Sequence, residues 1–451
     1  MKRSCSFRSC GLILVLILLT IAIPDVLAHQ HPRRNSHMNM LGPPEWYQDA
    51  EGVIWERTYG GANWEWANDL IEVSDGGYAL VGFTDPTATT YGGVMWLVRT
   101  DADGNQLWNR TIGNLTEDVC RGDSLIECSD GGFAIAGDFL YEVPQHAEMW
   151  LVRTDANGDC IWNRTYNGPD GGALCTELIE CSDGGFALYG GASEDYYFVR
   201  TDSNGVQLWN RTYGYVGRDF AWPGSLVQCD DGGFAMLGNT QSLGSDSQVL
   251  LVRTDSDGNR LWRKDYDKPG YDLGHAILAL DSGFLIIAQN ERLLLWVIRI
   301  DDDGTIIWDR SYIHHTMWYH SHGIGIGTSA VQCSKGGFAI AGYGGSTTMG
   351  MVGGDAWLLR IDDAGNLLWD LIYGPQERNE VHAIIECSDG GFALAGQTGN
   401  QTQREFDFWL LRVADSLPIS GYRLAAMGLG SGFALIIGVL IFRRREDWLG
   451  M

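Results

Sequence analysis

The sequence predicts an all-β protein, a seven-bladed β-propeller closed by its N-terminal strand. Three landmarks recur in a fixed order with a period of roughly 50 residues, the spacing of propeller and solenoid repeats. They are a glycine turn, an arginine that ends an apolar run, and a tryptophan. The first tryptophan precedes the first glycine turn, and none follows the last arginine. The N-terminal segment VIWERTYG is therefore expected to supply the strand that the last repeat lacks.

Each landmark occurs seven times. The glycine turns contain Gly77, Gly132, Gly185, Gly233, Gly283, Gly337 and Gly391. The arginines are Arg99, Arg153, Arg200, Arg253, Arg299, Arg360 and Arg412. The tryptophans are Trp55, Trp108, Trp162, Trp209, Trp262, Trp308 and Trp369.

Each repeat holds four short strand candidates, as residues 124–168 illustrate with SLIEC, GFAIAG, MWLVRTD and CIWNRTY. These runs are rich in Val, Ile, Thr and aromatic residues and are bounded by Gly, Asp and Asn, which is typical of strands. The SDGG and TDANGD segments between them have the composition of hairpin turns. Four strands in each repeat predict propeller blades over residues 51–415, and a closed ring removes the exposed edge of an open array.

Residues that recur in every repeat are expected to belong to the scaffold. The seven arginines predict ion pairs with turn aspartates such as Asp101, Asp155, Asp202, Asp255, Asp301 and Asp362. The cysteines that end the first strand of several repeats are expected to be small buried hydrophobic residues; they are Cys128, Cys181, Cys229, Cys333 and Cys387. The DADGN turns do not match an EF-hand calcium loop, because Gly104 is fourth from Asp101 rather than sixth.

The two ends of the chain predict a surface protein with one membrane span. Residues 1–28 have basic residues, an apolar run and small residues before His29, which is typical of a secretory signal peptide, and residues 29–50 predict a flexible leader. After a short linker at 416–423, the apolar residues 424–442 predict a transmembrane helix. Arg443, Arg444 and Arg445 place the tail, 443–451, in the cytoplasm and the propeller outside the cell.

The repeat motifs DGGFALAG and LVRTDSDGN resemble those of archaeal and bacterial cell-surface β-propeller proteins, and PISGYR before the span with RRR after it resembles the C-terminal anchors of archaeal surface proteins. The resemblance covers residues 51–415 and implies the architecture, because a propeller is a scaffold for many activities. TDADGNQLW has a fainter similarity to quinoprotein propeller repeats, but its spacing is one residue short and the quinone-binding residues are not identifiable.

The aromatic residues that fall outside the repeat positions are the first binding candidates. Trp64, Trp66, Trp222 and Trp318, with Tyr319 beside the last, lie in expected connections between the fourth strand of one repeat and the first strand of the next. Such connections share one face of a propeller, where exposed aromatic rings can stack on sugars or hold a partner protein. The alternative is that these rings plug the channel mouth or pack against loops.

The segment SYIHHTMWYHSHGIGIG carries the candidate metal ligands His314, His315, His320 and His322. Imidazole nitrogens at close range suit zinc or copper. The alternative is a solvated polar loop, because no Cys or carboxylate completes a known spacing there. No cofactor is predicted apart from this possible divalent metal.

Sequons and cysteines outside the repeat positions suggest modifications outside the cell. N-glycosylation sequons stand at Asn109, Asn114, Asn163, Asn210 and Asn400, and the three within WNRT fall on the outermost strand of a blade. The alternative is that NRT is simply a good strand sequence. Cys120 and Cys175 occupy similar places in neighbouring blades and are the preferred disulfide pair.

Charge and motifs favour binding over catalysis. The formal net charge of −26 argues against nucleic acid as a partner, and the sequence has no GxSxG elbow, no zincin helix motif and no phosphate loop. The sequence predicts a non-enzymatic module at the cell membrane that binds an extracellular protein, a glycan or an envelope component through its loop face. The alternative is a surface enzyme, a hydrolase, lyase or metal-dependent oxidoreductase, with its site at the channel mouth.

Overall fold

The computed structural model describes residues 52–61, 64–85, 93–113, 119–141, 146–243, 246–290, 294–313, 323–346, 354–374, 378–400 and 405–415. All of them belong to one compact unit, Glu45–Met451. The predicted signal peptide, leader, linker, transmembrane helix and tail lie outside the described residues. Within the described ranges, no helix has the length and apolar character that a membrane span requires.

The described residues form antiparallel sheets of consecutive strands. Five sheets have four strands each, β6–β9, β10–β13, β14–β17, β18–β21 and β22–β25. The sixth sheet has eight strands and combines β2–β5 with β26, β27, β28 and β1. Its two halves are joined by one parallel bridge, between Trp64 and Phe406.

The strands fall into four groups by their order within a sheet. The first strands are β2 (Trp64–Glu72), β6 (Val119–Glu127), β10 (Leu174–Glu180), β14 (Asp219–Gln228), β18 (Leu273–Ala279), β22 (Gly323–Gln332) and β26 (Arg378–Glu386). The second strands are β3 (Tyr78–Asp85), β7 (Phe133–Tyr141), β11 (Phe186–Ala192), β15 (Phe234–Thr240), β19 (Phe284–Gln289), β23 (Phe338–Ser346) and β27 (Phe392–Asn400). The third strands are β4 (Val94–Thr100), β8 (His146–Thr154), β12 (Asp195–Thr201), β16 (Gln248–Thr254), β20 (Leu295–Ile300), β24 (Asp355–Ile361) and β28 (Glu405–Val413). The fourth strands are β5 (Gln106–Ile112), β9 (Cys160–Tyr166), β13 (Gln207–Tyr213), β17 (Arg260–Tyr266), β21 (Ile306–Tyr312), β25 (Leu367–Tyr373) and β1 (Val53–Tyr59).

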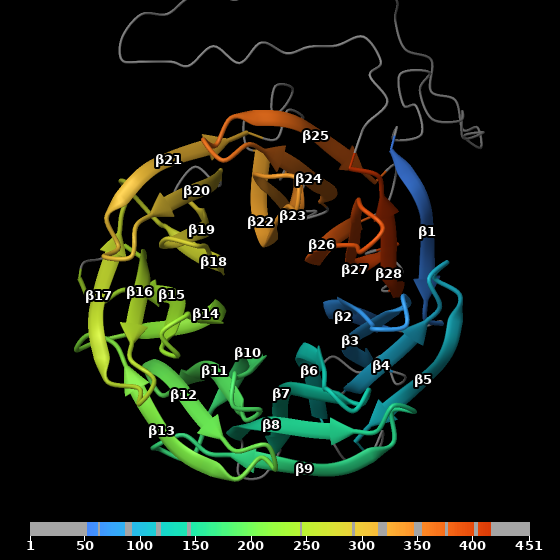
Figure 1. The fold of residues 1–451 in the computed structure, drawn as a ribbon, viewed down its shortest axis with the longest axis horizontal. Helices are drawn as coiled ribbons and strands as arrows, with labels where there is room; N and C mark the ends of the chain where they lie inside the picture. Colours follow the sequence, from blue (N-terminus) through green and yellow to red (C-terminus); the bar gives the residue numbers. More distant parts are fainter. Residues whose placement is uncertain are drawn as a thin grey trace, which may run out of the picture. The chain divides into compact units, whose positions relative to one another are not determined.

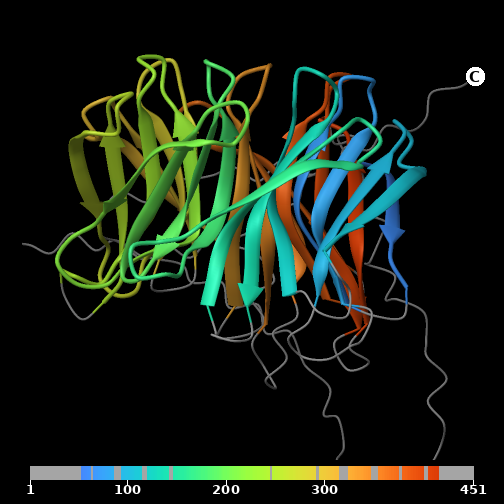
Figure 2. The same ribbon diagram turned by 90° about the horizontal axis from the view of Figure 1, so that it is seen from below.

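Within this unit the sheets stand around a common axis, as Figure 1 shows. The first strand of each sheet lies next to the open centre, and the fourth strand forms the outer wall. Figure 2 views the same ring from its side, so that its two faces form the upper and lower borders of the picture. Radially arranged sheets around a channel are the arrangement of a β-propeller.

The first strand of the chain closes the ring by pairing with the last. β1 runs antiparallel to β28, with Glu56 opposite Leu411 and Tyr59 opposite Phe408. The indole Nε1 of Trp409 on β28 also donates to Glu56 Oε2 at 3.3 Å. The order of the landmarks predicted this pairing.

The second and third strands are buried because each sheet packs against a neighbour on both sides. Their continuous apolar runs, such as ALVG in β3 and MWLV in β4, are almost fully enclosed. One core cluster unites Leu125 and Phe133 of one sheet with Val81 and Leu97 of the next. Continuous apolar runs, rather than alternating ones, are the pattern expected of strands covered on both faces.

The glycine turn is fixed by its aspartate and by the repeated arginine. In the second repeat, Asp130 Oδ1 accepts the backbone N–H of Gly132 at 3.0 Å and also pairs with Arg153. A side chain at Gly132 would lie 2.2 Å from the Thr154 carbonyl oxygen, so only glycine fits. The aspartate of the glycine turn is the partner of Arg99, Arg153, Arg200, Arg253 and Arg412.

The expected ion-pair partners of the arginines were therefore wrong. Asp155, for example, lies in the turn between the third and fourth strands and accepts the N–H groups of Asn157 and Asp159, each at 2.9 Å. Asp101, Asp202, Asp255, Asp301 and Asp362 make the same contacts within their own turns. The arginine instead reaches the glycine turn, whose aspartate accepts both its own turn N–H and the guanidinium.

Aromatic residues of the outer strand hold each sheet to the next. Trp108 on β5 lies against the turn of the next sheet, where a side chain at Gly158 would come within 2.7 Å of its ring. The Tyr166 hydroxyl on β9 donates to the carbonyl oxygen of Gly205 in the following turn at 2.7 Å. Because the same contacts recur around the ring, the tryptophan landmark is part of the interface between sheets.

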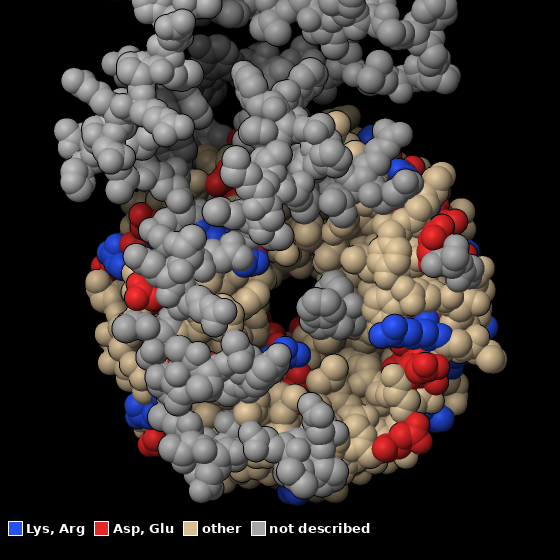
Figure 3. Space-filling view, turned by 180° about the vertical axis from the view of Figure 1, so that it is seen from behind, with Lys and Arg blue, Asp and Glu red and all other residues tan. Residues whose placement is uncertain are grey.

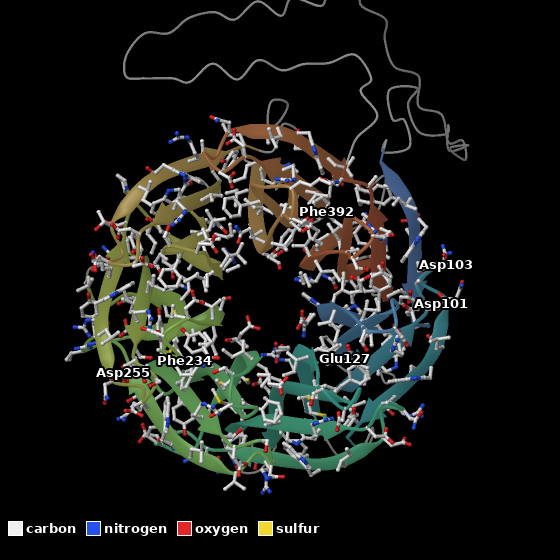
Figure 4. All side chains as sticks on the ribbon, viewed as in Figure 1. Asp101, Asp103, Glu127, Phe234, Asp255 and Phe392 are labelled. Atoms are coloured by element: carbon white, nitrogen blue, oxygen red, sulfur yellow. The ribbon has the colours of Figure 1, made fainter. Side chains whose placement is uncertain are left out.

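A serine–glutamate contact links the inner ends of neighbouring sheets. Ser74 donates its backbone N–H and its hydroxyl to the Glu127 carboxylate at 2.8 and 2.7 Å. Ser388 makes the same pair of bonds to Glu72, at the interface where the ring closes. Figure 4 places Glu127 nearer the centre of the ring, and Asp101, Asp103 and Asp255 at its outer wall. The interface between the last and first sheets of the ring is thus held by the same serine–glutamate contact as an interface between consecutive sheets.

Candidate functional site

The two faces of the ring differ in their connections. Neighbouring strands of a sheet are antiparallel, so the turns after the first and third strands share one face, called here the turn face. The links after the second and fourth strands lie on the opposite face, the connection face. Turns on the turn face repeat closely in sequence, whereas the links on the connection face vary in length and composition. Variation of this kind is where binding residues are expected on a repeated scaffold.

The connection face carries a groove of about 1090 Å³ between the sheets β6–β9, β10–β13 and β14–β17. It is lined by the start of β8, by residues 167–174, by the hairpin between β11 and β12 and by residues 218–221. Small residues, among them Gly171, Gly172 and Ala173, keep this space open. The side chains with charge around it are His146, Glu148, Asp170, Asp195, Arg218 and Asp219.

The β11–β12 hairpin at this groove has an unusual backbone. Ser193 has a φ of 59°, and it is the one non-glycine residue with positive φ in the part of the chain that the structure describes. Its hydroxyl donates to Asp170 Oδ2 at 2.7 Å, which ties the hairpin to the 167–174 segment across the groove. A non-glycine residue in this region costs of order 1–3 kcal/mol, and such positions cluster at functional sites.

Two carboxyl groups converge beneath the groove. A side chain added at Gly214 would meet both Asp219 Oδ2, at 2.3 Å, and Asp195 Oδ1, at 2.5 Å. Burial raises the pKa of Asp219, although hydrogen bonds from Thr240, Ser242 and the Tyr215 backbone oppose that shift. Burial and the charges of Asp219 and Glu194 raise the pKa of Asp195. This end of the groove is therefore suited to a group that supplies positive charge or hydrogen-bond donors.

The channel contains a second group of unrepeated carboxyls, on the inner strands β2, β6 and β10. Ser124 and Ser225 donate to the two oxygens of Glu177 at 3.0 and 3.4 Å, and Asp69 Oδ2 accepts the Leu125 N–H at 2.7 Å. Asp123 accepts from Asn68 at 3.1 Å and pairs with Arg121 at 3.2 Å. Figure 3 shows the opening at the centre of the ring.

Burial is the main cause of high pKa values in this group. It raises the pKa of Asp69 to about 6 and that of Glu177 to about 8, with the charge of Asp69 adding to the second shift. It also raises the pKa of Asp123 to about 7, against the opposing charge of Arg121. These carboxyls are only half-buried, so channel solvent reaches them, but crowding by the surrounding strands disfavours their charge.

Trp64 and Trp66 do not lie in a connection, contrary to expectation. Both belong to strand β2 and are half-buried. Trp66 stacks on Phe83 with ring centroids 6.2 Å apart and contacts the ring of His382 at 5.3 Å. The first strand begins earlier than its sequence suggested because β2 pairs with β3 from Trp64 onward. The two rings pack within the wall of the channel.

The side chains of the remaining aromatic and histidine candidates lie outside the described part of the structure. Trp222 lies in strand β14 rather than in a connection, and its side chain is outside the described part of the structure. Trp318 and Tyr319 lie outside the described residues, as do His314, His315, His320 and His322. Among the residues that are described, no group of three or more His, Cys, Asp or Glu side chains is arranged to hold a metal ion.

The structure describes the side chains of three of the five sequon asparagines. Asn109, Asn163 and Asn210 are exposed on the outermost strands β5, β9 and β13. Asn400 ends strand β27, but its side chain is not described, and Asn114 lies outside the described residues. Glycosylation at these positions stays a prediction.

The predicted disulfide between Cys120 and Cys175 is not formed. Cys175 is a free, buried thiol whose Sγ donates to the Glu177 carbonyl oxygen at 3.7 Å. The two residues lie in different core clusters, each between a different pair of sheets. Cys128, Cys181, Cys333 and Cys387 are buried as free thiols, and Cys229 is half-buried.

Comparison with solved structures identifies the architecture. The β-propeller domain of Myceliophteria thermophila Cps50 (Swd1) matches with a TM-score of 0.50 at 9% identity, covering 79% of this chain and 99% of that domain. The chain folds as a β-propeller. At this identity the likeness concerns the fold alone.

Two further propellers are similar at lower scores. The Dos1 propeller has a TM-score of 0.47 and 12% identity, covering 78% of this chain and 80% of its own. Chaetomium thermophilum Sqt1, bound to the N-terminus of ribosomal protein L10, has a TM-score of 0.47 and 11% identity, covering 81% of this chain and 100% of its own. No protein-family model matches the sequence, and no curated protein matches it.

The propeller carries functional candidates that the sequence did not indicate. The groove residues Ser193, Arg218 and Asp219 have no distinctive motif, and Glu177 sits where the first repeat has Asp69 and the others have Ser or Ala. Asp69, Asp123 and Glu177 are acids at strand positions where most repeats have another residue, and this departure is the sequence signal that points to them.

Proposed function

We propose that the chain is a non-enzymatic β-propeller of seven blades, anchored in the cell membrane with the propeller outside, that binds an envelope partner through its connection face. The blade count treats the halves of the eight-stranded sheet as two blades, because a single bridge at Trp64 and Phe406 joins them. The signal-peptide and anchor patterns at the two ends support the surface location.

The groove on the connection face carries this proposal. Its volume of about 1090 Å³ exceeds the range of small-ligand pockets, roughly 300–1,000 Å³. An open groove across three blades suits a segment of a protein partner, with the exposed Arg218 available for acids and the half-buried Asp195 for donors. The Ser193 backbone, held by Asp170, gives the rim a defined form before a partner binds.

The channel carboxyls favour the alternative, a surface enzyme. Unrepeated acids with raised pKa values in a channel are the groups that general acid catalysis requires. A protonated Glu177 near neutral pH can donate a proton to a leaving group, and the nearby Asp69 supplies a negative charge. A substrate would have to enter the channel mouth between β2, β6 and β10.

Site-specific photo-crosslinking on intact cells tests the binding proposal. A photoreactive amino acid at Ser193 or Pro169, on the groove, is compared with one at Ala156 or Asp103, on the turn face. A discrete protein attached from the groove positions alone supports the proposal. Equal attachment from both faces, or none from the groove while the protein remains folded at the surface, contradicts it.

The enzyme alternative is tested by the channel variant Glu177→Gln together with a screen of ester, glycoside and phosphoester substrates on the purified propeller. Turnover that falls at least about 100-fold in Glu177→Gln would favour the enzyme, since general acid catalysis typically contributes 10²–10⁴. Turnover that is unchanged in the variant assigns no catalytic role to the channel.

A further inference from the structure

The outer strands carry a repeated contact between an indole and a polar side chain. Trp296 Nε1 donates to Asp309 at 2.9 Å, Trp357 Nε1 to Asp370 at 3.2 Å, and Trp409 Nε1 to Glu56 at 3.3 Å. In each case the acceptor is on the fourth strand and the indole on the third. The position is therefore a structural one, and an acid fills it in these three sheets.

Three neighbouring sheets have asparagine at this position. Each asparagine pairs with the same position of the third strand as Asp309, which lies opposite Ile298. The pairs are Asn109 with Val98, Asn163 with Val152 and Asn210 with Val199. Each asparagine is exposed, and so is the threonine two residues later on the same face of the strand, Thr111, Thr165 or Thr212. Both sequon side chains therefore face solvent together.

At Asn163 the structure also fixes the orientation of the amide. Trp150 Nε1 donates to Asn163 Oδ1 at 3.3 Å. Only the oxygen of the amide can accept this bond, so Nδ2 is left on the other side of the group. A substituent on Nδ2 would leave the indole contact intact.

A hollow of about 550 Å³ lies beside the same side chain. It is lined by Ile112, Phe139, Trp150, Asn163 and Thr165, among others. Phe139 and Trp150 meet edge to face, with ring centroids 5.4 Å apart, and form its apolar part. The polar groups of Asn163 and Thr165 stand beside aromatic rings, an arrangement suited to a sugar with apolar and hydroxyl faces.

We infer that Asn163 is an N-glycosylation site whose first sugar occupies this hollow, with Asn109 and Asn210 completing a glycan-bearing sector on β5, β9 and β13. The inference rests on the surface location proposed above. The donor is a polyisoprenyl phosphate- or diphosphate-linked oligosaccharide. The bond from sugar C1 to the phosphate oxygen breaks, a bond from C1 to Nδ2 forms, Nδ2 loses one proton to the medium, and the lipid phosphate or diphosphate departs.

The sector has a physical use, because the outer strands are unpaired sheet edges. Leu107, Ile161 and Leu208 on these strands are 58%, 57% and 57% exposed, two residues before each asparagine. An exposed edge with apolar side chains favours pairing with other chains. Glycans at Asn109, Asn163 and Asn210 would cover these edges.

The test uses the full chain, with its own leader and anchor, produced in an N-glycosylating host. Glycopeptide mass spectrometry on the membrane fraction is expected to find sugar on Asn163 and to lose it in Asn163→Asp and Thr165→Val. Asn163→Asp keeps an acceptor for Trp150, as Asp309 and Asp370 do for their indoles, so its fold is retained. Asp309→Asn creates a sequon with Ser311 at the same register and is the control for a gained site.

Hydrogen exchange then tests the hollow. Peptides containing Phe139 and Trp150 are expected to exchange more slowly in the glycosylated chain than in Asn163→Asp. Unchanged exchange would overturn the seating of the sugar. An exported chain, cleaved after Ala28, with an unmodified Asn163 would overturn the inference alone, whereas a chain that keeps its leader and lacks sugar would overturn the surface location and the inference with it.

Discussion

At the scale of single residues, Glu177 shows how one side chain departs from the repeat and acquires a new role. It occupies the position of Ser124 and Ser225 in the adjacent blades, and it accepts a hydrogen bond from each. One carboxyl group thus joins three neighbouring inner strands. Burial raises its pKa to about 8, so the neutral form is favoured in the folded protein.

Stability is expected to fall as pH rises through the range set by Glu177. The contribution of the neutral form is fully present below the unfolded pKa, near 4.5, and is lost as pH rises to the folded pKa of about 8. Chemical denaturation at pH 5 and pH 8 should therefore show a smaller pH dependence in Glu177→Gln than in the wild type.

The control for this prediction is Glu177→Ala, which removes the titrating group and also the acceptor of both serines. It should lose the same part of the pH dependence but be less stable at both pH values. A wild-type slope retained in both variants would show that Glu177 does not titrate in this range.

At the scale of elements, the tight turns are what allow neighbouring blades to approach. Gly158 and Gly184 have nearly the same φ, 78° and 79°, in turns of different sheets. A side chain at Gly158 would lie 2.7 Å from the Trp108 ring of the preceding blade, whereas Gly184 has nothing within 4 Å. Gly184 is required only for its backbone conformation. Gly158 is required for its backbone conformation and also for the close approach of Trp108 from the neighbouring blade.

Comparison of Gly158→Ala with Gly184→Ala separates these two effects. Both variants should lose roughly 1–2 kcal/mol of unfolding free energy from the left-handed backbone. Gly158→Ala should lose about 1–3 kcal/mol more, because the methyl group overpacks Trp108. Equal losses in denaturant unfolding would mean that the turn moves away from Trp108 without cost.

At the scale of the whole propeller unit, stability depends on the pairing of its first and last strands. β1 covers the outer edge of β28 within the last blade, and Ser388 of that blade meets Glu72 of the first. The backbone runs from β1 of the last blade to β2 of the first, so closure depends on the noncovalent pairing of β1 with β28. Without β1, the third strand of the last blade would become an unpaired edge.

A chain that begins at residue 61 is expected to be less stable than one that begins at residue 51. Loss of β1 should lower the midpoint of thermal unfolding by roughly 5 °C or more, since 1 kcal/mol shifts it by about 2–4 °C in larger domains. Size-exclusion chromatography should also show association through the uncovered edge of β28. Identical melting and a monomer for both chains would contradict closure by β1.

The sequence by itself determined the repeat, the all-β class, the four strands of each repeat and the pairing of β1 with the last repeat. These features are local or periodic, because turn glycines, apolar runs and the order of landmarks can be read along the chain. The burial of Cys128, Cys181, Cys333 and Cys387 followed from the same periodicity. Surface location, blade count and glycosylation remain predictions of the sequence.

Only the tertiary structure decided which side chains meet. The partners of the repeated arginines, the separation of Cys120 from Cys175 and the packing of Trp66 against His382 depend on how sheets stand beside one another. The groove at Ser193, the carboxyls around Glu177 and the hollow at Asn163 are each formed by strands from different repeats. A pattern along one chain cannot give these distances, because they are set by packing between blades.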